Sequence, residues 1–208
     1  PHHKATVLRR FASLVEANTS ELAALEVLEA GHTVGNAEWE VGNVVNVFNY
    51  FAGGAERLLG AQIPVPGGLD VTFHEPFGVV GIIVPWNFPM PIFAWGVAPA
   101  LAAGNTVVVK PAEVTPLTAL RLAELALEAG LPEGVLTVVP GYGTVAGNRL
   151  VEHPDVRKIV FTGSTAVGTG ILRSSADRLK RVTLELGGKS PTIIFADSDV
   201  EAAAKAAP

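Results

Sequence analysis

Residues 78–110 read GVVGIIVPWNFPMPIFAWGVAPALAAGNTVVVK, and this stretch decides the fold. It contains two short apolar runs that are typical of buried strands, Val79–Val84 and Thr106–Val109. Between them, Ile92–Ala103 is apolar on every side, which indicates a buried helix. A strand, a helix and a second strand, all buried, predict a βαβ unit with parallel strands.

The same alternation continues along the chain. Further strands are predicted at Val135–Val139, Lys158–Phe161, Val182–Glu185 and Thr192–Phe195. The clearest helix is predicted to begin at Pro116 and end at Ala129, with Thr115 as its N-cap. The predicted fold class is therefore α/β, a doubly wound parallel sheet. Such sheets bind ligands at the carboxyl ends of their strands.

A different pattern precedes this region. Apolar residues at helical spacing predict three helices within residues 1–60, the last over about Asn36–Leu59. Two short strands, Gln62–Val65 and Leu69–His74, flank the turn sequence Pro66-Gly67-Gly68. We therefore divide the chain into a helical part (1–60), a β-hairpin (61–76) and an α/β core (77–208).

Composition excludes several classes of protein. Of the 208 residues, 49% are hydrophobic and only 17% are charged, so the chain is not disordered. The net charge of −5 argues against a nucleic-acid partner. No charged residue lies between Glu75 and Lys110, but prolines interrupt this segment, so we expect no membrane span.

The chain has no cysteine and therefore no disulfide, zinc finger or cysteine nucleophile of its own, which makes the cytoplasm the default compartment. None of its five histidines lies in an H-E-x-x-H motif, and we expect no metal site.

The residues that follow the strands are the candidate ligand contacts. Asn87 follows the first strand between two prolines, and its amide can either donate to an oxyanion or cap the next helix. On the residue alone, the helix cap is favoured. Lys110 and Glu113 follow the second strand, where they form either a grip on a sugar diol or a solvated charge pair.

Two later turns are rich in small residues. Gly141–Ala146 matches the G-x-G-x-x-A dinucleotide pattern, but no acidic residue ends the next strand, so an ordinary Rossmann interpretation fails and a simple turn suffices. Thr162-Gly163-Ser164 opens a helix, where it is about equally well explained as an anion site or as an N-cap.

The last motif is Glu185–Pro191, ELGGKSP. It is not a P-loop, because Thr183 stands where the first glycine is required and a predicted strand follows where a helix is required. Glu185 at a strand end is then either a general base or the partner of Lys189 in a structural ion pair.

Six segments in fixed order carry a family resemblance: EPFGVVG (75–81), PWNFP (85–89), PALAAGNT (99–106), KPAE (110–113) followed by Thr115-Pro116, FTGST (161–165) and LELGGKSP (184–191). Together they resemble the aldehyde dehydrogenase superfamily over essentially the whole chain. The resemblance implies that the α/β core (77–208) is a dinucleotide-binding fold of a variant Rossmann type. The resemblance implies oxidation of an aldehyde substrate to a carboxylate with NAD, or alternatively NADP. In that family a cysteine thiolate attacks the aldehyde and the resulting thiohemiacetal gives hydride to the nicotinamide.

The resemblance also implies roles for individual residues. Asn87 matches the oxyanion donor, Glu185 the general base, and Lys110 with Glu113 the grip on the adenosine ribose. Ser164 matches the pyrophosphate contact. The remaining implied cofactor contacts are Ile83, Val84, Pro85, Trp86, Ala112, Gly143, Gly147, Phe161, Thr162, Gly163, Val167, Leu186 and Gly187.

Members of this family are more than twice as long, and their catalytic cysteine lies downstream of the Glu185 motif. The resemblance therefore implies a fragment that lacks the catalytic domain and belongs to a homo-oligomer in which the hairpin pairs with another strand. The alternatives are a pseudoenzyme or interaction module that binds nucleotide without turnover, and, more remotely, an unrelated phosphate-binding α/β module.

Overall fold

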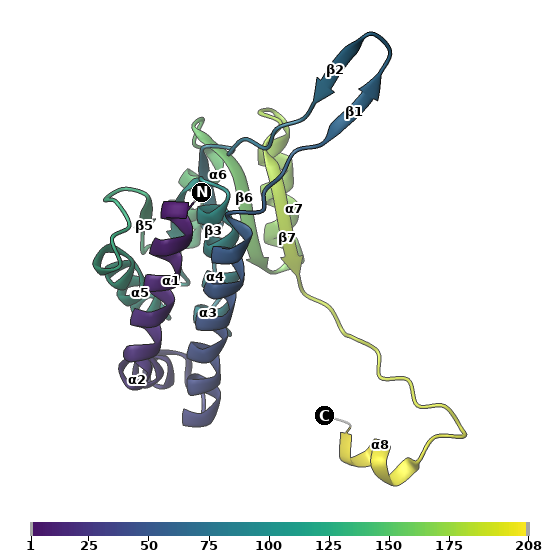
Figure 1. Ribbon diagram of the computed structural model, residues 1–208. Coiled ribbons are helices and arrows are strands. Elements are labelled where there is room, and N and C mark those ends of the chain that lie inside the picture. The colour runs from purple at the N-terminus through teal and green to yellow at the C-terminus, as the bar shows by residue number, and fades with distance from the viewer. Residues whose placement is uncertain (1, 207–208) are drawn as a thin grey trace.

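The computed structural model describes residues 2–206, and its centre is a five-stranded parallel sheet (Figure 1). Along the sheet the strand order is β5-β4-β3-β6-β7. The chain therefore runs outward from β3 to β5, returns to the other side of β3, and continues outward through β6 and β7. This reversal places a topological switch point between β3 and β6. The strands are β3 (Val79–Ile83), β4 (Thr106–Lys110), β5 (Leu136–Val138), β6 (Val156–Gly163) and β7 (Arg181–Leu186).

Both faces of the sheet are covered by helices, as a doubly wound fold requires. Along β3, Val80 and Ile82 pack into one core, whereas Val79 and Ile83 pack into the other, because successive side chains of a strand point to opposite faces. The first core contains α4 (Pro89–Ala102) and α5 (Leu117–Glu128). The second contains α6 (Asn148–Glu152) and α7 (Thr165–Ala176). The predicted fold class is confirmed.

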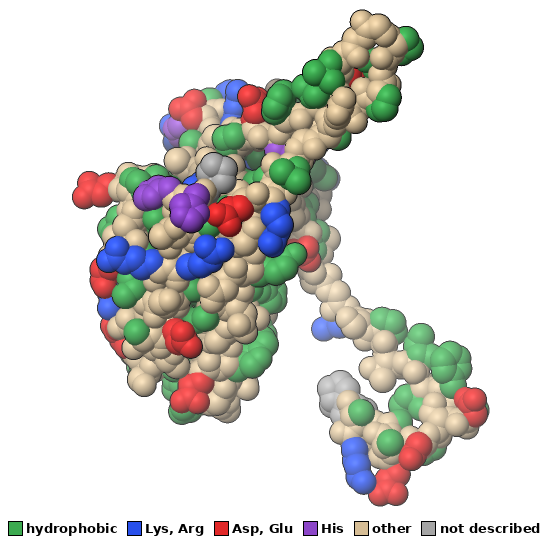
Figure 2. Space-filling model, in the orientation of Figure 1, with side chains coloured by type: hydrophobic (Ala, Val, Ile, Leu, Met, Phe, Trp, Pro, Cys, Tyr) green, Lys and Arg blue, Asp and Glu red, His purple; other side chains and the backbone are tan. Residues whose placement is uncertain are grey.

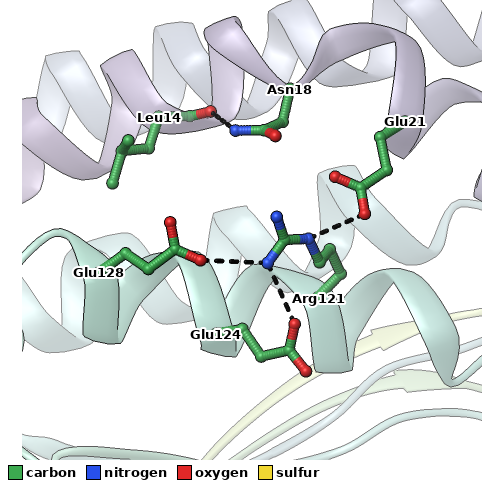
Figure 3. Close-up of polar contacts among 6 residues, drawn as sticks. All are labelled: Leu14, Asn18, Glu21, Arg121, Glu124 and Glu128. Carbon is green, nitrogen blue, oxygen red and sulfur yellow. Dashed lines mark hydrogen bonds and ion pairs between the residues drawn. The ribbon is translucent and has the colours of Figure 1, made fainter.

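Three N-terminal helices form an outer layer on α4 and α5: α1 (His2–Ala17), α2 (Thr19–Ala30) and α3 (Val34–Gly54). Phe11 and Phe48 meet edge to face in this layer, with ring centroids 4.5 Å apart. On its surface, Arg121 of α5 donates to Glu21 of α2 at 3.0 Å and also contacts Glu124 and Glu128 (Figure 3). The layer is thus held against α4 and α5 by apolar packing inside and by the Arg121–Glu21 ion pair outside.

The start of α5 differs from the prediction. The helix begins at Leu117, and Thr115 does not cap it. The carboxylate of Glu29 instead accepts hydrogen bonds from the backbone N–H groups of Leu117 and Thr118, at 2.7 and 3.0 Å. A carboxylate at a helix N-terminus is favoured by the free N–H groups and the helix dipole. The cap therefore comes from a residue 88 positions away in the sequence.

The hairpin and the C-terminal segment extend from the body of the molecule (Figure 1). Strands β1 (Gln62–Val65) and β2 (Gly68–Val71) pair antiparallel, and every residue in them is exposed. The space-filling view shows apolar side chains along both extensions (Figure 2). The second hairpin strand ends before the predicted His74.

No strand forms at Thr192–Phe195, so that prediction is wrong. These residues are exposed and pair with no other described strand, and without a partner an apolar run does not form a sheet. A short helix, α8 (Val200–Ala206), follows. Among the described residues, 2–206, no helix combines the length and the apolar character needed to cross a bilayer.

Candidate functional site

Two adjoining clefts lie at the carboxyl ends of the strands. The larger, about 970 Å³, lies beside the switch point between β3 and β6 and extends to β7. The smaller, about 440 Å³, extends from β3 toward β4 and the turn after β5. The two share Pro85, Trp86, Thr162, Gly163 and Ser164 in their walls, so they form one continuous groove.

All eighteen residues that the sequence singles out line this groove. The larger cleft receives the candidate catalytic pair together with the segment that follows β7: Asn87, Glu185, Leu186 and Gly187. The smaller cleft receives Ile83, Val84, Lys110, Ala112, Glu113, Gly143, Gly147, Phe161 and Val167, in addition to the shared residues. Residues from five loops are thus brought to one edge of the sheet.

The smaller cleft ends in an assembled polar group. The buried Lys110 ammonium lies 3.1 Å from Oε1 of Glu113, whose side chain is 39% exposed. The same oxygen accepts a short hydrogen bond from the backbone N–H of Gly143. The loop after β4 is thereby joined to the turn after β5, and the pair is not simply a solvated charge pair.

The environment of Glu113 favours its ionised form. Hydrogen bonds from its own backbone N–H and from that of Gly143, together with the Lys110 ammonium, hold the pKa of this carboxyl below its usual value of 4.5. Glu113 is therefore a carboxylate throughout the neutral range. A carboxylate accepts hydrogen bonds and donates none, which suits it to neighbouring hydroxyl groups.

The turn that opens α7 has a structural role that is visible in the contacts. Ser164 is the N-cap residue, and its Oγ accepts a hydrogen bond from Val167 N at 3.3 Å. Ser164, at the start of the helix, lies in the wall of both clefts, and Val167 of the first turn lines the smaller one. The N-cap interpretation is confirmed, and it is compatible with an anion at the same helix start.

Asn87 does not cap the helix that follows it, so the favoured interpretation from the residue alone is wrong. Helix α4 begins at Pro89, the N-cap position is Phe88, and no side chain caps it. Asn87 is exposed at the larger cleft, and its amide makes no hydrogen bond within the described residues, 2–206. Its two N–H donors are available to a ligand.

Glu185 is similarly unengaged. It lies on β7 opposite Thr162 of β6, and its side chain is exposed at the larger cleft. No ion pair with Lys189 forms in the described part of the chain. The structural alternative for this carboxylate is therefore not observed.

Close packing at two glycines shapes the groove. A Cβ at Gly163 would lie 2.5 Å from the Phe161 ring, and a Cβ at Gly168 would lie 2.5 Å from Leu186.

The glycine-rich turn after β5 has a different role. Gly143–Gly147 forms one turn of π-helix, η1, that leads into α6. This turn places the Gly143 N–H where it donates to Glu113. The glycines therefore shape this loop and do not form an ordinary dinucleotide-binding fingerprint.

One wall of the larger cleft is formed by residues that the sequence motifs do not include. Ile92, Trp95 and Gly96 of α4 line it beside Asn87. Their i, i+3, i+4 spacing places them on one helix face, and this spacing was the available signal. Trp95 is 53% exposed, and its indole N–H donates to Asn43 Oδ1 at 2.9 Å.

Comparison with known proteins gives a consistent result. The profile of the aldehyde dehydrogenase family matches residues 1–208. The cytosolic 10-formyltetrahydrofolate dehydrogenase of Mus musculus is 52% identical over 204 residues, which cover 95% of this chain and 23% of the mouse protein. An NAD⁺ complex of aldehyde dehydrogenase from Bacillus cereus superposes with a TM-score of 0.96 at 46% identity, covering 98% of this chain and 42% of that chain.

A second solved structure, PnpE in complex with nicotinamide adenine dinucleotide, gives a TM-score of 0.95 at 48% identity, with 98% of this chain and 42% of that chain covered. The chain thus spans about a quarter of the mouse relative and less than half of both solved structures.

Proposed function

Because the chain belongs to the aldehyde dehydrogenase family, we propose that it is the cofactor-binding portion of an enzyme that oxidises an aldehyde to a carboxylate with NAD. The observation that carries the proposal is the continuous groove at the switch point. It has a carboxylate–lysine pair at one end and two unengaged polar side chains, Asn87 and Glu185, at the other.

The groove fits an extended dinucleotide. Its two clefts lie within the size range of cofactor sites, and its walls are largely apolar, including Pro85 and Trp86. We expect Glu113 to accept hydrogen bonds from ribose hydroxyls, with Lys110 donating beside it. The first turn of α7 at Ser164 would hold the pyrophosphate. When bound, NAD supplies the hydride acceptor for the oxidation.

The larger cleft would hold the reacting aldehyde. The Asn87 amide is proposed to donate a hydrogen bond to the aldehyde oxygen as negative charge develops on it. Glu185 is proposed to accept a proton from the attacking group. The nucleophile must come from outside these 208 residues, since they contain no cysteine, and the family resemblance supplies a thiol for this role.

Two further proposals concern the assembly and the compartment of the protein. The exposed hairpin, with Leu69 71% exposed, is proposed to pair with another chain of a homo-oligomer (Figure 2). The cytosol is the proposed compartment, in line with the printed name of the mouse relative.

The test uses the complete protein that contains this chain. Calorimetric titration with NAD measures binding, and absorbance of NADH measures oxidation of a panel of aliphatic and aromatic aldehydes. We expect NAD binding together with oxidation of at least one aldehyde. Binding without oxidation of any aldehyde would favour the nucleotide-binding module instead, and failure to bind NAD would overturn the proposal.

A further inference from the structure

A second cluster of polar side chains lies away from the groove, in the N-terminal helical layer. Glu26 of α2, His32 of the following turn and Glu40 of α3 bring one ligand-type atom each within 4.8 Å of one another. Both carboxylates are fully buried, and the His32 side chain is 17% exposed. The His32 ring also packs against Phe88, at 5.3 Å between ring centroids.

Local sequence explains why the three residues converge. Gly31 ends α2 in a left-handed conformation, with φ of 74°, which turns the chain sharply. Two residues later, the Thr33 side chain caps α3 by accepting from Asn36 N. Helices α2 and α3 therefore fold back on each other across a short turn, and a single segment, residues 26–40, supplies all three groups.

The carboxylates lack the partners that burial normally demands. With both carboxyls ionised, neither oxygen of Glu26 nor Oε2 of Glu40 has a hydrogen-bond partner among residues 2–206. The Glu40 carboxyl and the Thr118 hydroxyl nevertheless lie near enough to Glu26 to shift its pKa. Within residues 2–206, no Lys or Arg forms an ion pair with either carboxylate, and the contact of His32 Nδ1 with Glu40 is an ion pair only when the imidazole is protonated. Buried carboxylates are usually paired or bound to a metal, and here no permanently charged side chain balances the two of them.

We propose that Glu26, His32 and Glu40 bind a divalent metal ion with the ligand preferences of zinc. One imidazole nitrogen and two carboxylate oxygens form a ligand set that zinc accepts, with a water or the second Glu26 oxygen completing four-coordination. Two carboxylates and one divalent cation are electrically neutral together, which lowers the cost of burying the charges. Metal–ligand bonds of about 2.0–2.2 Å in a tetrahedral site place the ligand atoms roughly 3.3–3.6 Å from one another. His32 Nδ1 and Glu40 Oε1, which are in direct contact, would therefore move apart to admit the ion.

A proton is the competing occupant. Burial, together with Glu40, raises the pKa of Glu26 to about 8, so without a cation this carboxyl keeps its proton at neutral pH. A shared proton would leave the cluster as a purely structural element of the helical layer. The two accounts differ in whether the protein binds zinc at this place.

The experiment titrates chelator-treated complete protein with Zn²⁺ by calorimetry, after alkylation of thiols, which also bind zinc. His2 and His3 are replaced by Gln throughout, because these adjacent histidines form a separate potential metal site. We expect about one tight Zn²⁺ site for each chain. His32→Gln should weaken zinc binding about tenfold or more. Mutation of a residue that only hydrogen-bonds to a metal ligand already lowers metal affinity by that much, and loss of a ligand should cost at least as much. Mg²⁺, which prefers six oxygen ligands, should not bind at this site.

Glu38→Gln is the matched control, because Glu38 is an exposed carboxylate on α3, two residues from Glu40. It should leave zinc binding unchanged. Circular dichroism shows whether His32→Gln is folded. X-ray absorption of zinc-loaded protein with native His32 gives an independent reading and should show one imidazole among oxygen ligands. Absence of tight zinc binding, equal binding by His32→Gln, or a shell without imidazole would each overturn the proposal.

Discussion

The two ends of the groove are built differently. At the smaller cleft, Lys110, Glu113 and the Gly143 N–H are already bonded to one another, and they hold the Glu113 carboxyl ionised. At the larger cleft, Asn87 and Glu185 are exposed and unengaged within the described chain. One end is preassembled by this chain, whereas the other leaves its polar groups free for a ligand.

This difference matches the proposed division of labour. A site that binds the same cofactor in every turnover gains from rigid, preorganised groups, because little order is lost on binding. Groups that act in the transition state must be free to bond to the reacting atoms. We therefore expect substitutions at the larger cleft to lower turnover and substitutions at the smaller cleft to alter cofactor binding.

The largest effect is expected for Glu185→Gln in the complete protein. Removal of a positioned general base should lower kcat by about 10²–10⁴ while leaving NAD affinity within about twofold. Steady-state kinetics and calorimetry measure the two quantities. Glu133→Gln, at an exposed carboxylate remote from the groove, is the control. Turnover like that of the wild type would remove Glu185 from the proposed chemistry.

Asn87→Ala should have the next largest effect. Loss of an oxyanion donor costs about 10²–10³ in kcat. Because Asn87 caps no helix, thermal stability should not change, and Asn49→Ala on the exposed surface of α3 should change neither quantity. A fall in melting temperature with normal kcat would contradict both the structure of the loop and the proposed role.

Cofactor choice tests the preassembled end. A 2′-phosphate brings about −1.5 to −2 charges next to the Glu113 carboxylate and removes a hydroxyl donor. Lys110 offsets part of the repulsion. We expect kcat/KM for NAD to exceed that for NADP about tenfold or more, and Glu113→Gln to reduce the ratio. Equal values for the two cofactors in the wild type would place the ribose away from Glu113.

The same contrast explains which features the sequence could predict. Local sequence patterns indicate where the strands and apolar helices lie along the chain and which residues follow each strand. Because parallel strands bring their carboxyl ends to one edge, locating Asn87, Glu113 and Glu185 after strands was enough to place them in one groove. That step needed topology but no side-chain geometry.

Features that depend on distant partners were not predictable in this way. Thr115 has good capping chemistry, but Glu29 occupies the helix start from another layer. Thr192–Phe195 has the composition of a strand, but no other strand of the described residues lies beside it. Glu26, His32 and Glu40 match no metal motif, because their convergence depends on how α2 and α3 pair rather than on a fixed spacing.

The smallest effect concerns the acid stability of the preassembled end. The folded state lowers the pKa of Glu113 below 4.5, so the contacts of this carboxylate stabilise the protein fully above about pH 4.5. That contribution is lost as the pH falls through the lower, folded-state pKa, because both states are then protonated. With the side chain 39% exposed, solvent screening limits the contribution to about 1 kcal/mol or less.

The variant Glu113→Gln tests this contribution, because glutamine resembles the protonated glutamic acid in shape and charge. Urea unfolding of the complete protein and this variant should therefore show a constant stability difference from pH 7 to about 5, shrinking below pH 4.5. A difference that persists unchanged at pH 3 would mean that packing, and not the charge of Glu113, stabilises this end of the groove.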